Sequence, residues 1–243
     1  MLAVAYAFGV QVQGLRKLYA GGRGVEDVSL SAPRGAITGF IGANGAGKST
    51  TLRCILGILA PDGGRIALFG EEASAAARRR IGFIPEERGL NPADRARDAV
   101  AFHARMRDVP RREAYRRADE LLERVGLGEV GRSRVGRLSK GNAQRVQLLC
   151  AFAHDPELLI LDEPFSGLDP MAQEEVRDLL TGFRDRGGSV LLSTHALLAA
   201  ERMCDRVTVL SAGRTLFDGP TARALGREPD LPSAYRRMLE RAA

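Results

Sequence analysis

The chain has 243 residues, of which 44% are hydrophobic and 27% charged, and its formal net charge is +6. This length suits one large α/β domain, or a core domain with a smaller insertion. No run approaches the ~20 apolar residues that a membrane span requires, which excludes a membrane-spanning chain. Cys54, Cys150 and Cys204 lie far apart without a CxxC pair, which indicates a reduced cytoplasm instead of a disulfide framework.

The positive charge fits two interpretations: arginines on solvated helix faces, or an anionic partner such as nucleic acid or a membrane surface. Only three of the 36 basic residues are lysines, and the arginines are spread along the chain. Short clusters stand at residues 78–80 and 111–117. Solvated faces are the preferred interpretation. The first nine residues, MLAVAYAFG, are apolar but short and have no basic residue before them, so they do not fit a secretory signal.

Strand-like and helix-like patterns alternate along the first third of the chain. An apolar strand at 36–44 enters a glycine-rich loop, and helical spacing follows at 49–59. PDGG at 61–64 predicts a turn. The strands expected in this region are residues 10–19, 25–35, 36–44, 65–70 and 81–85.

From residue 91 to residue 152 strand patterns vanish and helical segments follow, which predicts a helical insertion. Strands return at 157–164, 189–195 and 206–219, the last as a hairpin turning at Ala212-Gly213. This alternation predicts a mostly parallel sheet covered on both faces. The expected organisation is an α/β core at 1–90 and 153–220, a helical subdomain at 91–152 and a short helical C-terminal tail at 221–243.

A glycine-rich loop, GANGAGKST at residues 42–50, contains the pattern GxxxxGK[ST] between a strand and a helix. Its backbone N–H groups can curl around phosphate oxygens, and the helix N-terminus adds positive potential. Lys48 supplies a point charge for terminal phosphates, and the Ser49 hydroxyl is placed for Mg²⁺. A plain glycine-rich turn is the alternative. The nucleotide-binding positions expected here are Gly42, Asn44, Gly45, Ala46, Gly47, Lys48, Ser49 and Thr50.

Two adjacent carboxylates end the apolar strand LLILDEP at residues 158–164. Because successive side chains on a strand point to opposite faces, Asp162 can reach Mg²⁺ through a water while Glu163 faces an attacking water. Glu163 is then the general base, a role worth on the order of 10²–10⁴ in rate. Two ordinary loop charges are the alternative, and the phosphate loop weakens it.

Three further features are ambiguous when taken singly. His195 ends the apolar strand SVLLSTH, where a lone histidine is usually structural, and Tyr19 can stack on a base or simply pack. His103 and His154 gain no such context, and the three histidines predict no metal cluster. LSKGNAQRVQ, residues 138–147, begins like a helix suited to hold an anion, yet it lies far from the phosphate loop.

Taken in order, GANGAGKST, LSKGNAQRVQ, LLILDEP, SGLD at 166–169 and STH at 193–195 resemble the ATP-binding subunits of ABC transporters. Lys48 to Ser139 is 139 − 48 = 91 residues and Ser139 to Asp162 is 162 − 139 = 23, and both intervals look like that family's. The resemblance covers about residues 10–220. It implies a P-loop NTPase (RecA-like) core with a mostly parallel sheet, an N-terminal antiparallel β portion and a helical insertion.

The resemblance also implies ATP and Mg²⁺ as cofactors and gives the ambiguous residues a role. It places His195 at the γ-phosphate, Tyr19 on the adenine ring and Asp169 at a dimer seam. In this family the LSGGQ-like stretch binds the γ-phosphate of ATP held by the opposite subunit. Ser139 and Gly141 would therefore serve the nucleotide of a second copy, or of a homologous subunit, in a head-to-tail dimer.

The sequence departs from the family pattern at two places. The signature reads LSKGN instead of LSGGQ, so Lys140 adds a charge and Asn142 shortens an amide, while Ser139 and Gly141 remain. The family's glutamine loop reads FIPEERGL at 83–90, with Glu86 as the candidate oxygen ligand of Mg²⁺. Both departures look like a subgroup that serves bacterial export-type permeases for drugs, sodium or polymers.

The implied function is that of an ATP-hydrolysing subunit that drives a separate transmembrane permease, with export as the expected direction. It would be cytoplasmic and peripheral on the inner face of the cell membrane through that permease. The alternative is a soluble ABC-type ATPase acting on nucleic acid or ribosomes. The 91 residues between Lys48 and Ser139 show no sustained heptads for the coiled coils of DNA-repair relatives, and the chain has one cassette, unlike translation-factor relatives. Nucleic acid is therefore the weaker expectation.

Overall fold

The computed structural model describes residues 7–87 and 89–242. Most of the apolar leader at 1–9, and Arg88 within FIPEERGL, lie outside the described residues. The chain divides into two compact units, one formed by Met1–Arg78 with Phe183–Ala243 and the other by Arg79–Gly182. Within the described residues no helix combines the length and apolarity that crossing a membrane requires.

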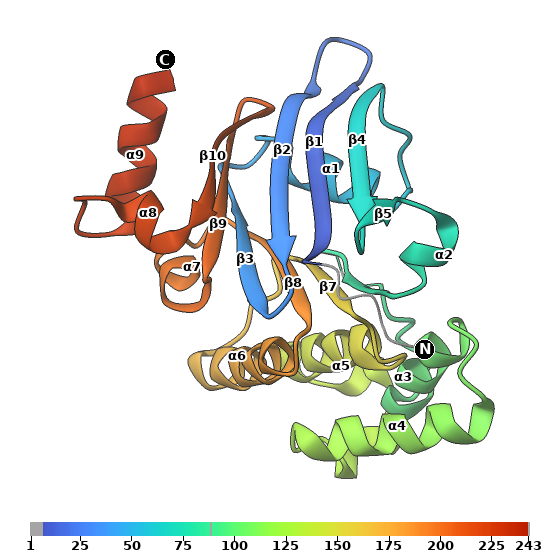
Figure 1. Cartoon of the computed structure of the whole chain (residues 1–243). Coiled ribbons are helices and arrows are strands. Elements are labelled where there is room, and N and C mark those ends of the chain that lie inside the picture. The colour runs from blue at the N-terminus through green and yellow to red at the C-terminus, as the bar shows by residue number, and fades with distance from the viewer. Residues whose placement is uncertain (1–6, 88, 243) are drawn as a thin grey trace. The chain divides into compact units, whose positions relative to one another are not determined.

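The first unit begins with an antiparallel sheet in the order β5-β4-β1-β2, in which β1, β2 and β4 lie side by side (Figure 1). Buried side chains alternate with partly exposed ones along the second half of β2, because one face of an antiparallel strand packs on the core and the other is nearer to solvent. This sheet confirms the predicted N-terminal antiparallel portion. The strands are β1 (Phe8–Leu18), β2 (Gly24–Pro33), β4 (Gly63–Leu68) and β5 (Glu71–Glu72).

The same unit contains a parallel core in which β3 (Ala36–Ile41) pairs with both β8 (Ser189–Thr194) and β9 (Arg206–Ser211). Every residue of β3 and β8 is buried, as expected of strands covered on both faces. β9 and β10 (Arg214–Pro220) form the predicted hairpin. Its turn residues Ala212 and Gly213 have φ values of 45° and 75°, which suit the twist of a tight hairpin.

The helices of this unit include α1, which follows the glycine-rich loop, and a C-terminal pair. α1 ends at Ile55, short of the predicted residue 59, because the chain turns at Gly57 with a φ of 72°. The helices are α1 (Lys48–Ile55), α2 (Ala75–Arg78), α7 (Leu197–Met203), α8 (Thr221–Leu225) and α9 (Leu231–Ala242).

The second unit holds the parallel pair β6 (Ile81–Ile84) and β7 (Leu158–Asp162) together with the helical insertion. Helices α3 and α4 pack against each other, and Ala104 on α3 and Ala114 and Ala118 on α4 are fully buried. The helical segments are α3 (Ala96–Arg105), α4 (Arg111–Arg124), α5 (Lys140–Phe152), the 3₁₀ turns Glu129–Arg132 and Val135–Arg137, and α6 (Pro170–Asp185), whose last three residues are assigned to the first unit. The predicted α/β class with a helical insertion is confirmed.

Gly82 gives a test of how closely β6 approaches α5. A Cβ at this position would run into the Ala151 carbonyl oxygen and lie 2.8 Å from Cδ2 of Leu159. We expect Gly82→Ala to lower the free energy of unfolding by about 1–3 kcal/mol through overpacking. Gly63→Ala is the matched control, since the nearest atom would lie at an ordinary 3.9 Å. Urea unfolding followed by circular dichroism measures both, and equal midpoints would contradict the close approach.

Candidate functional site

The glycine-rich loop and His195 leave the parallel core of the first unit at the same edge. Ile41, the last residue of β3, pairs with Thr194 of β8 and with Val209 of β9. Gly42 and His195 are the next residues along their strands. Ligands of open α/β sheets bind at the carboxyl ends of such strands, so the structure brings these two predicted elements together at the edge where a nucleotide is expected.

The loop before α1 has the backbone conformation that a phosphate cradle needs. Gly45 and Gly47 have φ values of 79° and 109°, which disfavour any residue with a Cβ. Lys48 is only 7% exposed, and its Nζ donates to the carbonyl oxygens of Gly42 at 2.7 Å and Ala43 at 3.2 Å. These bonds offset the cost of burying the ammonium and hold it over the loop.

Tyr19 and His195 flank this loop. The Tyr19 hydroxyl lies 3.4 Å from Oγ1 of Thr50, and the tyrosine is 40% exposed, so its ring is accessible to a ligand. His195 is exposed as well. Both side chains are therefore accessible from outside the unit, as residues that bind a ligand must be. The first unit therefore gathers Tyr19, the phosphate loop and His195.

The second unit gathers the predicted acids at one edge of the β6–β7 pair. Ile84 pairs with Leu161, so the segment carrying Glu86 and the residues Asp162 and Glu163 follow from neighbouring strand ends. Asp162 and Glu163 are buried, whereas Glu86 is exposed. Glu163 has a φ of 50°, in the left-handed region that glycine favours. Such backbone strain is concentrated at functional sites.

The signature stretch forms the exposed N-terminus of α5. The Ser139 hydroxyl caps this helix by accepting the Asn142 N–H at 3.2 Å. Open space surrounds Gly141, where a Cβ would meet nothing within 4 Å. A Cβ on Gly167 would lie 2.9 Å from Cε of Lys140. Lys140, which stands where the family pattern has a glycine, therefore packs along the SGLD segment.

Asp169, predicted at a dimer seam, lies exposed at the start of α6. Its Oδ1 accepts the Ala172 N–H at 2.9 Å, which is a helix N-cap. The sequence pattern SGLDP therefore also has a local structural reason, since it ends one loop and begins a helix.

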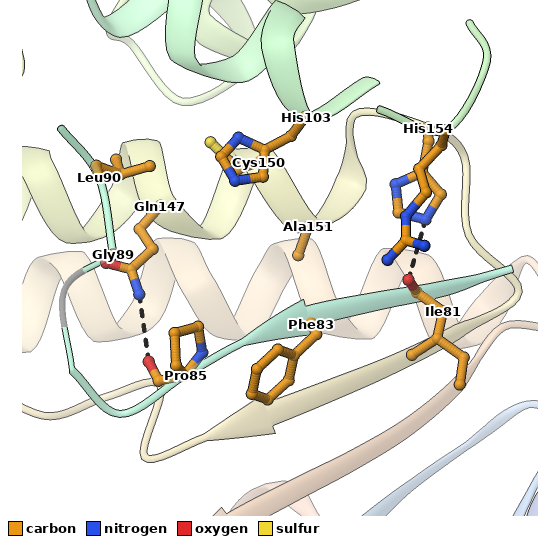
Figure 2. A pocket seen from close by; sticks show the side chains of 11 residues that line it. Ile81, Phe83, Pro85, Gly89, Leu90, His103, Gln147, Cys150, Ala151 and His154 are labelled. Atoms are coloured by element: carbon orange, nitrogen blue, oxygen red, sulfur yellow. Dashed lines mark hydrogen bonds between the residues drawn. The ribbon is translucent and has the colours of Figure 1, made fainter. Parts of the chain in front are cut away.

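Sequence reasoning missed the role of Gln147. Its Nε2 donates to the Pro85 carbonyl oxygen at 3.2 Å (Figure 2). It also donates to the Glu87 carbonyl oxygen at 3.3 Å, and the two bonds tie the middle of α5 to the segment carrying Glu86. Gln147 is buried, and it stands in the largely apolar run VQLLCAF. A polar residue in such a run was the available signal, because buried amides need partners.

An open groove of about 230 Å³ lies between α3, α5 and β6 in the second unit (Figure 2). Phe83, Leu90, His103 and Cys150 are among its lining residues. The neighbouring helix face carries Phe102 and Met106, which are 55% and 62% exposed. The groove is therefore lined in part by the segment that follows β6, and the end of α3 near its lining residue His103 exposes apolar side chains.

The two arginine clusters are largely paired within their own units. Arg80 donates to Glu157 at 2.5 and 2.9 Å, and Arg78 donates to the Ile55 carbonyl at 3.0 Å. On α4 the guanidinium groups of Arg116 and Arg117 both bond Glu113 and lower its pKa to about 2. This pairing favours solvated, self-neutralised helix faces over an anion-binding surface.

The residues predicted to hold Mg²⁺, Ser49 in the first unit and Asp162 and Glu86 in the second, all carry oxygen atoms. Ser49, Asp162 and Glu86 offer hydroxyl and carboxylate oxygens, the ligand type that Mg²⁺ prefers. Among the described residues no three histidine, cysteine or acidic side chains gather to hold a metal by themselves. Mg²⁺ normally takes one or two protein oxygens and completes its shell with phosphates and water.

Comparisons with known proteins agree with these features. The family described as "ABC transporter" matches residues 25–166, and one described as "AAA domain, putative AbiEii toxin, Type IV TA system" matches residues 134–200. The uncharacterized ABC transporter ATP-binding protein YhaQ of Bacillus subtilis is 37% identical over 86% of this chain and 70% of its own length. The daunorubicin resistance ATP-binding protein DrrA3 of Streptomyces coeruleorubidus is 36% identical over 86% and 67%. The methionine import ATP-binding protein MetN of Caulobacter vibrioides is 38% identical over 86% and 66%.

Two solved structures share the fold. One, described as an ATP-binding subunit of an ABC transporter, superposes with a TM-score of 0.87 at 32% identity, covering 95% of this chain and 99% of that chain. The other is cbiO1 from Clostridium perfringens, described as part of the ABC transporter complex cbiONQ. Its TM-score is 0.80 at 28% identity, over 96% of this chain and 99% of that chain.

His154 makes the second unit sensitive to acid. Its ring donates from Nε2 to the Ile81 carbonyl at 3.1 Å, and burial, followed by the positive charge of Arg107, lowers its pKa from 6.5 to about 4. Between these values the unfolded imidazole binds a proton that the folded one does not, so stability falls as pH falls from 6.5 towards 4, by at most about 1.4 kcal/mol per pH unit. His154→Gln keeps a donor but does not titrate. We expect urea unfolding at pH 7 and pH 5 to show a smaller loss in this variant, and parallel losses would contradict the assignment.

Proposed function

The chain belongs to the ABC transporter family and is an ATP-hydrolysing subunit of a transporter, and on this premise we propose that it dimerises around two ATP molecules and drives a separate permease that exports its substrate. The observation that carries the proposal is the convergence of the Lys48 loop, His195 and Tyr19 at one edge of the parallel core. No ordinary packing requirement brings an exposed histidine, an exposed tyrosine and a glycine cradle to the same place.

In this proposal the first unit binds the nucleotide. The adenine stacks on the exposed ring of Tyr19, and the phosphates lie against the backbone N–H groups of residues 42–50 and the N-terminus of α1. Lys48, already held over the loop by two carbonyls, neutralises the terminal phosphates. His195, exposed at the end of β8, donates to the γ-phosphate.

The second unit supplies the base. Glu163, buried directly after β7, accepts the proton of the attacking water. Asp162 beside it would bind Mg²⁺ through a water. Ser49, Asp162 and Glu86 would hold Mg²⁺, which when bound neutralises charge on the phosphate oxygens. The left-handed backbone of Glu163 sets the direction of its side chain. In this proposal that direction aims the carboxylate at the water, which is the reason for the strained conformation.

The exposed start of α5 supports a dimer in which each signature serves the other subunit's ATP. Ser139, the free space at Gly141 and the positive end of α5 form an anion-binding surface that its own unit leaves uncovered. A partner's γ-phosphate fits this surface, and Asp169, exposed at the start of α6, would lie at the seam. The helical subdomain of residues 91–152 thereby presents the signature, the core at 1–90 and 153–220 holds ATP, and residues 221–243 form a helical tail.

The groove between α3, α5 and β6 is the proposed contact with the permease. The segment that follows β6 lines it through Pro85, Gly89 and Leu90 and is held to α5 by Gln147. Phe102, next to the lining residue His103 on α3, is exposed. An apolar segment of the permease seated there would sense movement of Glu86. The protein would thereby be peripheral, on the inner face of the cell membrane.

Export is proposed because the FIPEERGL and LSKGN departures occur together and because DrrA3, whose name denotes drug resistance, is similar over most of the chain. MetN, which is named for import, is also similar to this chain. A transport assay in vesicles measures the direction of transport directly. The alternative of an ATPase acting on nucleic acid or ribosomes gains no support, since the relatives compared are named for transport or resistance and the arginine clusters are internally paired.

Glu163→Gln tests the assignment of the base. The amide keeps the shape of the side chain but does not accept the water proton, so we expect turnover to fall by at least about 10²-fold while ATP binding persists. ATP-bound dimers should then accumulate and be visible by size-exclusion chromatography. Glu72→Gln, an exposed change on β5, is the matched control and should keep wild-type turnover. Wild-type turnover in purified Glu163→Gln protein would sink the assignment.

A mixed dimer tests whether the signature acts in trans. Lys48→Ala disables a phosphate loop, and Ser139→Arg places a bulky side chain where the γ-phosphate must approach. Each homodimer should be nearly inactive, whereas a dimer of the two variants, isolated with two different affinity tags, should regain one whole site. Phosphate release and ATP-dependent dimer formation are the measurements.

The control for the mixed dimer pairs wild type with a chain that carries both changes. If the signature acts in trans, each site of this control has one defect, and it should stay inactive. If the signature acts in cis, the two pairings exchange their behaviour. Equal activity of the two pairings would refute the trans arrangement.

A further inference from the structure

The C-terminal helix α9 contacts the phosphate loop directly. The hydroxyl of Tyr235 accepts the backbone N–H of Ala43 at 3.2 Å, although 192 residues separate the two in sequence. Ala43 is the second residue of GANGAGKST and stands two positions before Gly45, the first of the two loop glycines with left-handed backbone. A helix far from every nucleotide motif thus reaches the loop at its entry.

The peptide groups around Ala43 connect this contact to Lys48. While the N–H of Ala43 is held by Tyr235, its carbonyl oxygen accepts the Ala46 N–H at 3.1 Å and Nζ of Lys48 at 3.2 Å. One residue therefore has its donor fixed by α9 and its acceptor used to aim the lysine ammonium. Movement of Tyr235 would tilt the same residue that holds Lys48.

α9 is anchored well enough to act as a support. Leu231 and Ala234 are fully buried, and Asp230 caps the helix by accepting the Ser233 N–H at 2.8 Å. The Leu231 N–H donates to Oε2 of Glu201 at 2.6 Å. Glu201 belongs to α7, which begins two residues after His195, so α9 is bonded both to the phosphate loop and to the helix that follows the histidine.

We propose that Tyr235 is a positioning residue for ATP binding, whose hydroxyl holds Ala43 so that the loop and Lys48 are in place before the nucleotide arrives. The role acts through Ala43, without contact between Tyr235 and the nucleotide. Preorganisation of a binding loop lowers the ordering cost of binding. Once ATP is bound, its phosphates order the loop themselves. The hydrogen bond from Ala43 to Tyr235 therefore contributes to the affinity for ATP and contributes little to the rate of the chemical step. This inference rests on ATP binding at residues 42–50.

Tyr235→Phe removes the hydroxyl and leaves the ring. We expect KM for ATP and the dissociation constant of ADP, measured by calorimetry, to rise about two- to tenfold, the range of one hydrogen bond. The kcat at saturating ATP should change less than about twofold, because the loss concerns binding made equally in ground and transition states. Tyr115→Phe on α4, in the other unit, is the matched control and should leave KM and kcat unchanged.

Ala43→Pro removes the donor of the same hydrogen bond and closes a double-mutant cycle. We expect it to weaken ADP binding too, and Tyr235→Phe to have no further effect in the Ala43→Pro background. An additive effect, or an unchanged ADP affinity in folded Tyr235→Phe protein, would overturn the inference. A lower melting temperature with unchanged affinity would also overturn it, because it would assign Tyr235 a structural role only. Failure of the wild-type protein to bind ATP would instead overturn the proposed function.

Discussion

The parallel register of β3 between β8 and β9 is the constraint on which the nucleotide side of the protein depends. Because Ile41 lies opposite both Thr194 and Val209, the loop after β3 and the histidine after β8 emerge together. A shift of one residue in this register would turn the buried faces of fully covered strands around and separate the loop from His195. The interior packing of residues 36–41 and 189–194 therefore fixes the geometry of groups that lie outside it.

The phosphate loop combines backbone strain with a buried charge, and both are compensated locally. Glycines take the left-handed conformations at residues 45 and 47, while the carbonyls of Gly42 and Ala43 solvate the Lys48 ammonium. An arginine would not fit this arrangement, because a planar guanidinium cannot be enclosed by two neighbouring carbonyls as a compact ammonium can. The chain uses arginine for nearly all its other basic positions. The lysine at position 48 is therefore explained by the geometry of the loop and not by the amino-acid composition.

In the second unit, α5 connects the signature stretch with the segment that carries Glu86. The N-terminus of α5 presents Ser139 and Gly141, and its middle reaches the Glu86 segment through Gln147. A rotation of α5 that moved the signature would therefore also move the backbone next to Glu86. Phe102 and Met106 are exposed at the end of α3, which packs against α5, so a partner seated on them has a surface from which α5 can be displaced. One helix thus connects the surface proposed for ATP of the other subunit with the surface proposed for the permease.

The sequence by itself determined the α/β class, the positions of the strands along the chain, the hairpin at Ala212-Gly213 and the family, because glycines, apolar runs and motif spacing are local properties of the chain. It also singled out Lys48, Asp162, Glu163 and Ser139, whose chemistry is visible in their immediate neighbours. Only the tertiary structure decided which strand ends lie side by side, that Gln147 bonds the Glu86 segment, and that Tyr235 reaches Ala43. These are contacts between residues 60 to 192 positions apart, set by packing of whole elements, and no pattern within a short window records them.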